Sequence, residues 1–217
     1  MKTCNVFLLS ILFCLLSSHL IAQTFGIKGG ANLAIMLAKD NDNVYSDDFK
    51  LNPGFHIGGT VELPIKGILT VEPGLLLTKR GYKSENVAER ETQKNSINTY
   101  YIDLPVSLKA NFDIAENTAL SLLLGPYLGC ALFGKVKSDV SGLDGDMTYR
   151  SDIIIGEELH RFDYGLTFGP EVSFSSFFIG VSYDLGLRDV FPDDQYGTIM
   201  KNRLIKVSFG YRFNRQN

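Results

Sequence analysis

The sequence offers few side chains that could act as a nucleophile, a base or a metal ligand. Of its three histidines, only His56 and His160 lie outside the N-terminal segment. With Asp47, Asp48 or Ser151 they could form a surface hydrolase or acyltransferase site, since such a site needs a nucleophile and a base within hydrogen-bonding reach. Their spacing selects none of these partners. We therefore expect polar rim residues and no catalytic residue.

Metal chemistry has equally little support. Asp139, Asp144 and Asp146 lack the bidentate glutamate and the spacing of a calcium-binding loop, so we expect a solvated acidic loop there. Cys130 is the only cysteine after residue 22, which leaves no partner for an intramolecular disulfide and no thiolate metal site. We expect no metal and no cofactor.

The N-terminus has the pattern of a cleaved secretory signal peptide. Lys2 precedes an apolar run from Val6 to Leu16, and Ala22 provides a small residue at the expected cleavage site. The remaining residues, 23–217, are enough for one barrel-sized domain. Removing Lys2 from 21 basic and 24 acidic residues leaves 20 and 24, a net charge of −4, which does not favour nucleic-acid binding.

The clearest pattern is the alternation of side chains between Phe162 and Arg188. Apolar residues occupy one parity and polar residues or glycine the other, apart from Phe178. Because successive side chains of a strand point to opposite faces, this predicts two amphipathic strands, each long enough to cross a bilayer when tilted.

The same period continues along the chain and predicts eight strands. Their expected ranges are 24–36, 53–63, 68–82, 99–112, 118–135, 162–174, 177–188 and 202–213. Long polar connections (37–52, 83–98, 136–161 and 189–201) alternate with short ones (64–67, 113–117 and 175–176). We therefore expect an all-β, eight-stranded, antiparallel, up-and-down transmembrane barrel in the outer membrane of a Gram-negative cell envelope.

A soluble lipocalin-type barrel would show the same alternation with its apolar face turned inward. The aromatic residues favour the membrane, because they gather near both ends of the strands as interfacial girdles do. One expected girdle comprises Phe25, Phe112, Phe174, Phe177, Tyr211 and Phe213, and the other Tyr82, Tyr100, Phe133 and Phe162.

The polar parity then lines the barrel interior and brings acids and bases together. Eight strands enclose a space that side chains can fill, and buried charges are tolerable only when they are paired. We therefore predict a plugged lumen rather than a pore. The expected charge network contains Lys28, Glu62, Glu72, Arg80, Asp103, Lys109, Asp163, Glu171, Asp184, Arg188, Lys206 and Arg212.

Two further cations, Lys79 and Arg203, fall on the outward parity at the loop end of their strands. They could bind lipopolysaccharide phosphates. Extension of their long side chains to the interface explains them equally well.

Five short motifs, in this order, resemble the PorT-like outer-membrane β-barrel family, small barrels with an OmpA/OmpX-like fold. They are the stretches at 25–32, 71–76, 101–105, 125–129 and 163–166. The resemblance covers the whole chain after the signal segment and implies the barrel fold. The founding member of the family takes part in protein secretion and in assembly of surface enzymes.

We therefore expect a monomeric, non-enzymatic outer-membrane barrel with a structural or interaction role. Its expected partners are outer-membrane lipid or lipopolysaccharide and, by analogy with the family, secretion or assembly proteins, although a fold does not fix a function. Two alternatives stay open: a barrel enzyme acting at its extracellular rim, and a narrow solute channel.

Overall fold

The computed structural model describes residues 23–39, 49–88, 91–142, 145–191 and 199–213. No helix among them is long and apolar enough to cross a membrane. The predicted signal segment 1–22 lies outside these residues, as do Asp47, Asp48 and Asp144. The strands are β1 (Thr24–Lys39), β2 (Phe49–Lys50), β3 (Asn52–Lys66), β4 (Leu69–Ala88), β5 (Glu91–Ala115), β6 (Thr118–Gly142), β7 (Gly145–Ile153), β8 (Phe162–Phe174), β9 (Phe177–Gly186) and β10 (Ile199–Phe213).

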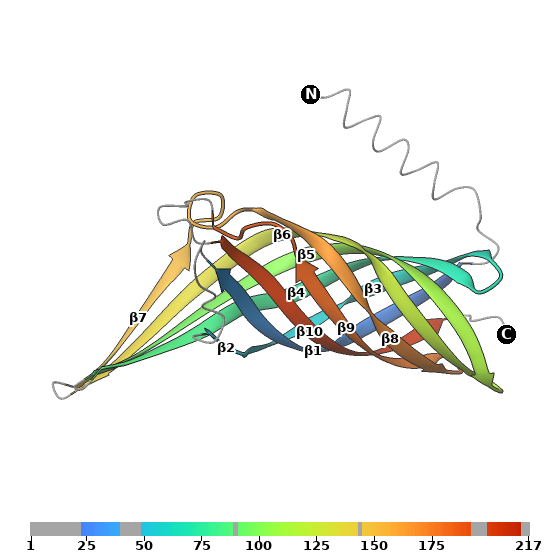
Figure 1. Ribbon diagram of the computed structural model, residues 1–217, viewed down its shortest axis with the longest axis horizontal. Helices are drawn as coiled ribbons and strands as arrows, with labels where there is room; N and C mark the ends of the chain where they lie inside the picture. The colour runs from blue at the N-terminus through green and yellow to red at the C-terminus, as the bar shows by residue number, and fades with distance from the viewer. Residues whose placement is uncertain (1–22, 40–48, 89–90, 143–144, 192–198, 214–217) are drawn as a thin grey trace, which may run out of the picture.

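Eight of these strands close into a barrel (Figure 1). The ring runs β1, β3, β4, β5, β6, β8, β9, β10 and back to β1, and every neighbouring pair is antiparallel. The closing pair runs from Phe25 opposite Phe213 to Lys39 opposite Ile199. Since ring closure pairs the backbone groups of both edges, the wall has no open strand within the barrel. The predicted eight-stranded antiparallel meander is confirmed.

Side chains alternate between the two faces of the wall as the sequence period predicts. Along β8, Phe162, Tyr164 and Phe168 are exposed outside, whereas Asp163 and Glu171 are buried inside. Large apolar side chains on the outside and charged ones on the inside suit a hydrocarbon surrounding rather than water. The soluble alternative is wrong, because its apolar side chains would point inward.

The segments 83–98 and 136–161, expected to be loops, are largely β-structure. β4 continues to Ala88, β5 begins at Glu91, and β6 runs on to Gly142, where β7 pairs with it. These four strands extend beyond the other strands as a tapering sheet, at the left of Figure 1. Alternating polarity failed to reveal this sheet because polar side chains occur on both of its faces.

The two ends of the barrel differ. At one end, here called the turn end, short turns join β3 to β4, β5 to β6 and β8 to β9. Gly67 adopts a φ of 58° in the first of these turns, a conformation that glycine accommodates without cost. The opposite end carries the protruding sheet and is called the sheet end.

An apolar cluster covers the sheet end, and its buried members come from the wall, from β7 and from the connections after β7 and β9. Main-chain hydrogen bonds hold these connections in place: His160 N–H donates to the Val190 carbonyl at 2.9 Å, and Ala131 N–H to that of Arg161 at 2.7 Å. Tyr82, expected in an outer aromatic girdle, packs against this cluster instead. The buried members are Tyr101, Ala131, Ile153, Leu159 and Val190.

One glycine makes room for the ring of Phe178, a large apolar side chain inside the lumen. A Cβ at Gly210 would lie 2.2 Å from the ring of Phe178, so Gly210→Ala must displace that ring. We expect this substitution to destabilise the barrel by about 1–3 kcal/mol, measured by urea unfolding in lipid vesicles. Gly59→Ala is the matched control, since its Cβ would meet nothing closer than 3.7 Å. Equal losses for both variants would contradict a packing origin.

Candidate functional site: the charged lumen

The charged side chains of the lumen form two groups at different heights in the barrel. We call them the turn-side network and the mouth-side network, the latter lying nearer the sheet end. The turn-side network comprises Lys28, Glu62, Glu72, Lys109, Glu171 and Arg212. The mouth-side network comprises Arg80, Asp103, Asp163, Asp184 and Lys206.

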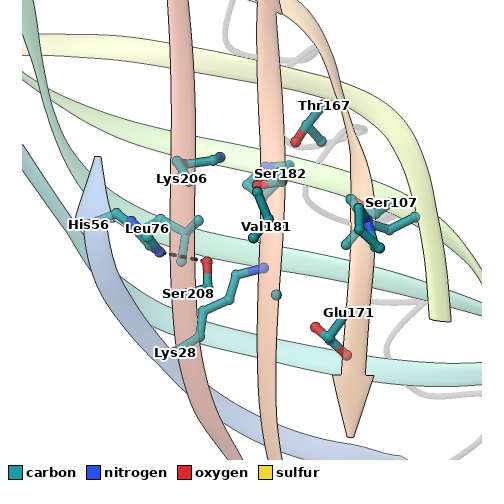
Figure 2. A pocket seen from close by; sticks show the side chains of 14 residues that line it. Lys28, His56, Leu76, Ser107, Thr167, Glu171, Val181, Ser182, Lys206 and Ser208 are labelled. Carbon is teal, nitrogen blue, oxygen red and sulfur yellow. Dashed lines mark hydrogen bonds between the residues drawn. The ribbon is translucent and has the colours of Figure 1, made fainter. Parts of the chain in front are cut away.

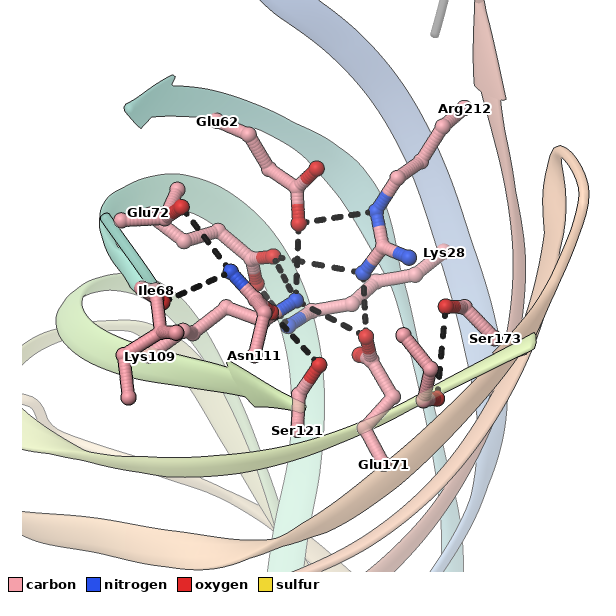
Figure 3. Close-up of polar contacts among 12 residues, drawn as sticks. Lys28, Glu62, Ile68, Glu72, Lys109, Asn111, Ser121, Glu171, Ser173 and Arg212 are labelled. Carbon is pink, nitrogen blue, oxygen red and sulfur yellow. Dashed lines mark hydrogen bonds and ion pairs between the residues drawn. The ribbon is translucent and has the colours of Figure 1, made fainter. Parts of the chain in front are cut away.

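Lys109 is the hub of the turn-side network (Figure 3). Its Nζ lies 2.8 Å from Glu62 Oε1, 3.0 Å from Glu72 Oε2 and 2.8 Å from Glu171 Oε1. Arg212 binds the same three carboxylates from the other side, and its Nε is 2.9 Å from Glu62 Oε1.

Lys28 completes this network through Glu72 Oε1 at 3.2 Å. Three carboxylates therefore face three cations, and most of these side chains are almost fully buried. Because each charge has an opposite partner, the desolvation cost of burial is offset by close pairing.

Arg80 is the centre of the mouth-side network. Its Nη1 lies 2.5 Å from Asp163 Oδ2 and its Nη2 2.7 Å from Asp103 Oδ2. The guanidinium also lies over the rings of Tyr101 and Tyr127, 4.8 and 4.9 Å from the ring centroids, where cation–π attraction adds to the ion pairs.

The rest of this network holds Asp163 and Asp184 in place. Asn202 donates to Asp163 Oδ2 at 3.0 Å, and the Tyr127 hydroxyl to the same oxygen at 3.3 Å. Lys206 Nζ pairs with Asp184 Oδ2 at 2.8 Å.

The structure thus brings together eleven of the twelve side chains named for the lumen. Arg188 is the exception. β9 ends at Gly186, and Arg188 forms no ion pair with any other described residue. The alternating pattern predicted that Arg188 would point inward, but β9 ends two residues before it.

His56 lies in the lumen rather than at the rim. Its Nδ1 lies 2.6 Å from Asn32 Oδ1 and its Nε2 2.9 Å from Ser208 Oγ, so β1, β3 and β10 each supply one residue of this hydrogen-bonded series. Figure 2 shows the hydrogen bond between His56 and Ser208. Sequence reasoning missed both partners of His56. The inward parity of Asn32 and Ser208 was the available signal, but it does not reveal which strands pair across the closing seam.

An amide, an imidazole and a hydroxyl in this order resemble the relay of a serine hydrolase. The cavity beside them has a volume of about 20 Å³ and is lined by Lys28, Lys206 and Ser182, among others. Such a space holds a water molecule but not an ester or amide substrate. The chain of hydrogen bonds therefore satisfies buried polar groups and has no room for the chemistry.

The other candidate groups are also dispersed. Ser151 is exposed on β7, whereas His160 lies in the connection to β8, and no hydrogen bond joins them.

The two outward cations are bonded to carbonyl groups of the main chain. Lys79 donates from Nζ to the Pro53 carbonyl at 3.1 Å, and Arg203 donates from Nη1 to the Gly186 carbonyl at 2.6 Å. Within the described ranges, no group of three His, Cys, Asp or Glu side chains could hold a metal ion.

Comparison with known proteins identifies the fold. Residues 21–192 match the model of the family described as outer membrane protein beta-barrel domain. No curated protein matches the sequence significantly.

Among solved structures, the chain is similar to Ail, the attachment invasion locus protein of Yersinia pestis, with 18% identity and a TM-score of 0.36 over 89% of this chain and 100% of Ail. It is also similar to Neisserial surface protein A, with 17% identity and a TM-score of 0.41 over 88% and 97% of the two chains. It is similar as well to the outer membrane protein OprG of Pseudomonas aeruginosa, with 13% identity and a TM-score of 0.37 over 89% of this chain and 97% of OprG. These likenesses concern the fold alone.

The hub position of Lys109 gives a direct test of the turn-side network. We expect Lys109→Met to destabilise the barrel by about 3–5 kcal/mol, because it leaves three buried carboxylates with two cations. Adding Glu171→Gln restores the charge balance and should recover part of the loss, as measured by urea unfolding in vesicles. Lys94→Met, which removes an exposed lysine 3.4 Å from Glu85, should change stability by less than about 1 kcal/mol. A double variant no more stable than Lys109→Met would contradict the charge-balance argument.

Proposed function

Since the chain belongs to the outer membrane protein beta-barrel domain family and lies in the outer membrane, we propose that it is a non-enzymatic interaction protein. Its barrel serves as a filled anchor, and the sheet that protrudes from it receives a protein partner. The observation that carries this proposal is the difference between the two faces of the protruding sheet.

On one face of the protruding sheet, three neighbouring rows of side chains carry no charge, and we call these rows the uncharged face. Side chains in register share a face, so Ser84, Asn95, Ser138 and Tyr149 form one row across β4, β5, β6 and β7. The neighbouring rows contain Tyr82, Ile97, Val136 and Ser151 on one side, and Gln93, Val140 and Met147 on the other. Tyr82, Ile97 and Val136 also pack against the apolar cluster, which makes the two surfaces continuous.

The opposite face is charged with both signs. One row contains Lys83, Lys137 and Arg150, and the next contains Glu85, Lys94 and Asp139. Hydrogen bonds from Lys137 and Thr148 lower the pKa of Asp139, which keeps that charge in place in acidic surroundings. This face is suited to water, whereas the uncharged face is suited to contact.

β7 adds an accessible edge to the uncharged face. Met147 and Tyr149 are 57% and 60% exposed on it, and the Tyr149 hydroxyl donates to Met147 Sδ at 3.2 Å. Tyrosine and methionine are enriched at protein interfaces, where they combine large contact area with adaptable shape. The resemblance to PorT-like barrels points to secretion or assembly proteins as the partner class, and the apolar outer wall to membrane lipid as the surrounding medium.

A site-specific photocrosslinker distinguishes the two faces. Incorporated in place of Tyr149 in cells, it should yield a reproducible crosslinked protein, because it lies on the uncharged face of the edge strand. The same probe in place of Arg150, one residue away on the charged face, is the matched control and should yield far less. Equal yields at both positions, or no adduct at either, would refute this surface assignment.

The channel alternative is tested by conductance. Two layers of ion pairs and the apolar cluster cross the lumen, so we expect no steady ion current through the purified protein in a planar bilayer. A large, stable conductance would show that the lumen is open and would overturn the filled-anchor role.

A further inference from the structure

The two lumen networks differ in their charge balance. In the turn-side network three carboxylates face three cations. In the mouth-side network Asp103, Asp163 and Asp184 face only Arg80 and Lys206, so full ionisation would leave one buried negative charge uncompensated. A buried, unpaired charge costs several kcal/mol, and proteins commonly avoid it by binding a proton.

The excess charge is localised at Arg80. Lys206 is paired with Asp184 at 2.8 Å, which leaves Asp103 and Asp163 to share one guanidinium. If both carboxyl groups were ionised, the single positive charge of Arg80 would neutralise only one of them. In such pairs one of the two groups keeps its proton.

Hydrogen bonding points to the same place. Oδ1 of Asp103 and Oδ1 of Asp163 are buried and accept no hydrogen bond, although the Oδ2 atoms of both residues are bonded. Both residues are nine-tenths or more buried. Arg80 Nε and Asp184 Oδ1 in this network are also buried without a hydrogen-bond partner. In the turn-side network the same is true of Arg212 Nε, but of no buried carboxylate oxygen among the described residues.

Gly129 leaves room for the carboxyl group of Asp103. In the sheet register it lies between Asp103 on β5 and Asp163 on β8. A Cβ at this position would come within 2.7 Å of Asp103 Oδ1. The absence of a side chain at Gly129 therefore allows Asp103 to extend across this position toward Arg80.

The groups around the pair supply no further positive charge. Tyr101 and Tyr127 contribute ring faces to Arg80, and Tyr127 and Asn202 donate to Asp163. His56, on β3, is bonded to Asn32 and Ser208, and Lys28 to Glu72. No described set of acidic and histidine side chains could hold a metal ion here.

We propose that Asp103 and Asp163 form a proton-binding site in the folded barrel and hold one proton between them at neutral pH. The Arg80 site is then neutral, as the turn-side network is. The proton is part of the folded structure, because the separated aspartates of the unfolded chain ionise near pH 4.

Infrared spectroscopy of the barrel in lipid vesicles tests the site directly. At pH 7 the wild type should show the carbonyl stretch of a protonated carboxyl group. Asp103→Asn and Asp163→Asn should each abolish the band, because the remaining aspartate then pairs alone with Arg80 and ionises. Asp139→Asn, which removes an acid from the protruding sheet, is the control and should leave the band unchanged.

Unfolding equilibria provide a second readout. The folded wild type holds a proton that the unfolded chain has lost, so raising the pH favours unfolding. Relative to Asp163→Asn, the unfolding constant of the wild type should rise about tenfold for each pH unit between pH 5 and pH 7. Titration of His56 cancels in this comparison, since both proteins retain it.

A wild-type spectrum without the band at pH 7 overturns the proposal, even if neither variant folds. Parallel pH profiles of the wild type and Asp163→Asn also overturn it. Stability that depends on the concentration of sodium ions in place of pH would show that a bound cation neutralises the pair.

Discussion

Charge compensation inside a closed ring is the constraint on which this structure depends. Ring closure fixes which side chains point inward, and eight strands leave them no bulk water. Lys109 and Arg212 each contact the same three glutamates, which come from β3, β4 and β8. These contacts tie together strands that are not neighbours in the wall. In soluble proteins contacts within an apolar core hold the strands together, whereas here ion pairs across the interior do so.

The outer surface also reverses the arrangement of a soluble protein, in which polar side chains face outward. Apolar side chains cover the barrel wall, because hydrocarbon surrounds it, and polar side chains return where β4, β5, β6 and β7 leave the wall. Within the protruding sheet the polarity divides again, into a charged face and an uncharged face that merges with the apolar cluster. The charged face is suited to contact with water. The uncharged face is the surface on which we propose that a protein partner binds.

Alternation in the sequence predicted the fold because a period of two is a direct consequence of strand geometry. It gave the ring strands and the inward position of the charged residues, apart from Arg188, which follows the end of β9. It could not reveal the protruding sheet, whose main-chain pairing needs no apolar face. Nor could it bring Asn32, His56 and Ser208 together, since their contact depends on the seam between the first and last strands. Residues 1–22 remain a predicted signal peptide.

The length of β5 and β6 has a mechanical consequence. Each runs for 25 residues as a continuous strand, and a tilted strand needs only about 9–11 residues to cross the bilayer. At about 3.3 Å per residue, the remaining 14–16 residues extend for on the order of 50 Å. The hydrogen-bonded ladder between them makes the sheet a stiff lever, so a pull on its tip is transmitted into the barrel wall. A force on the protruding sheet would therefore act on a wall whose strands are joined across the interior by ion pairs.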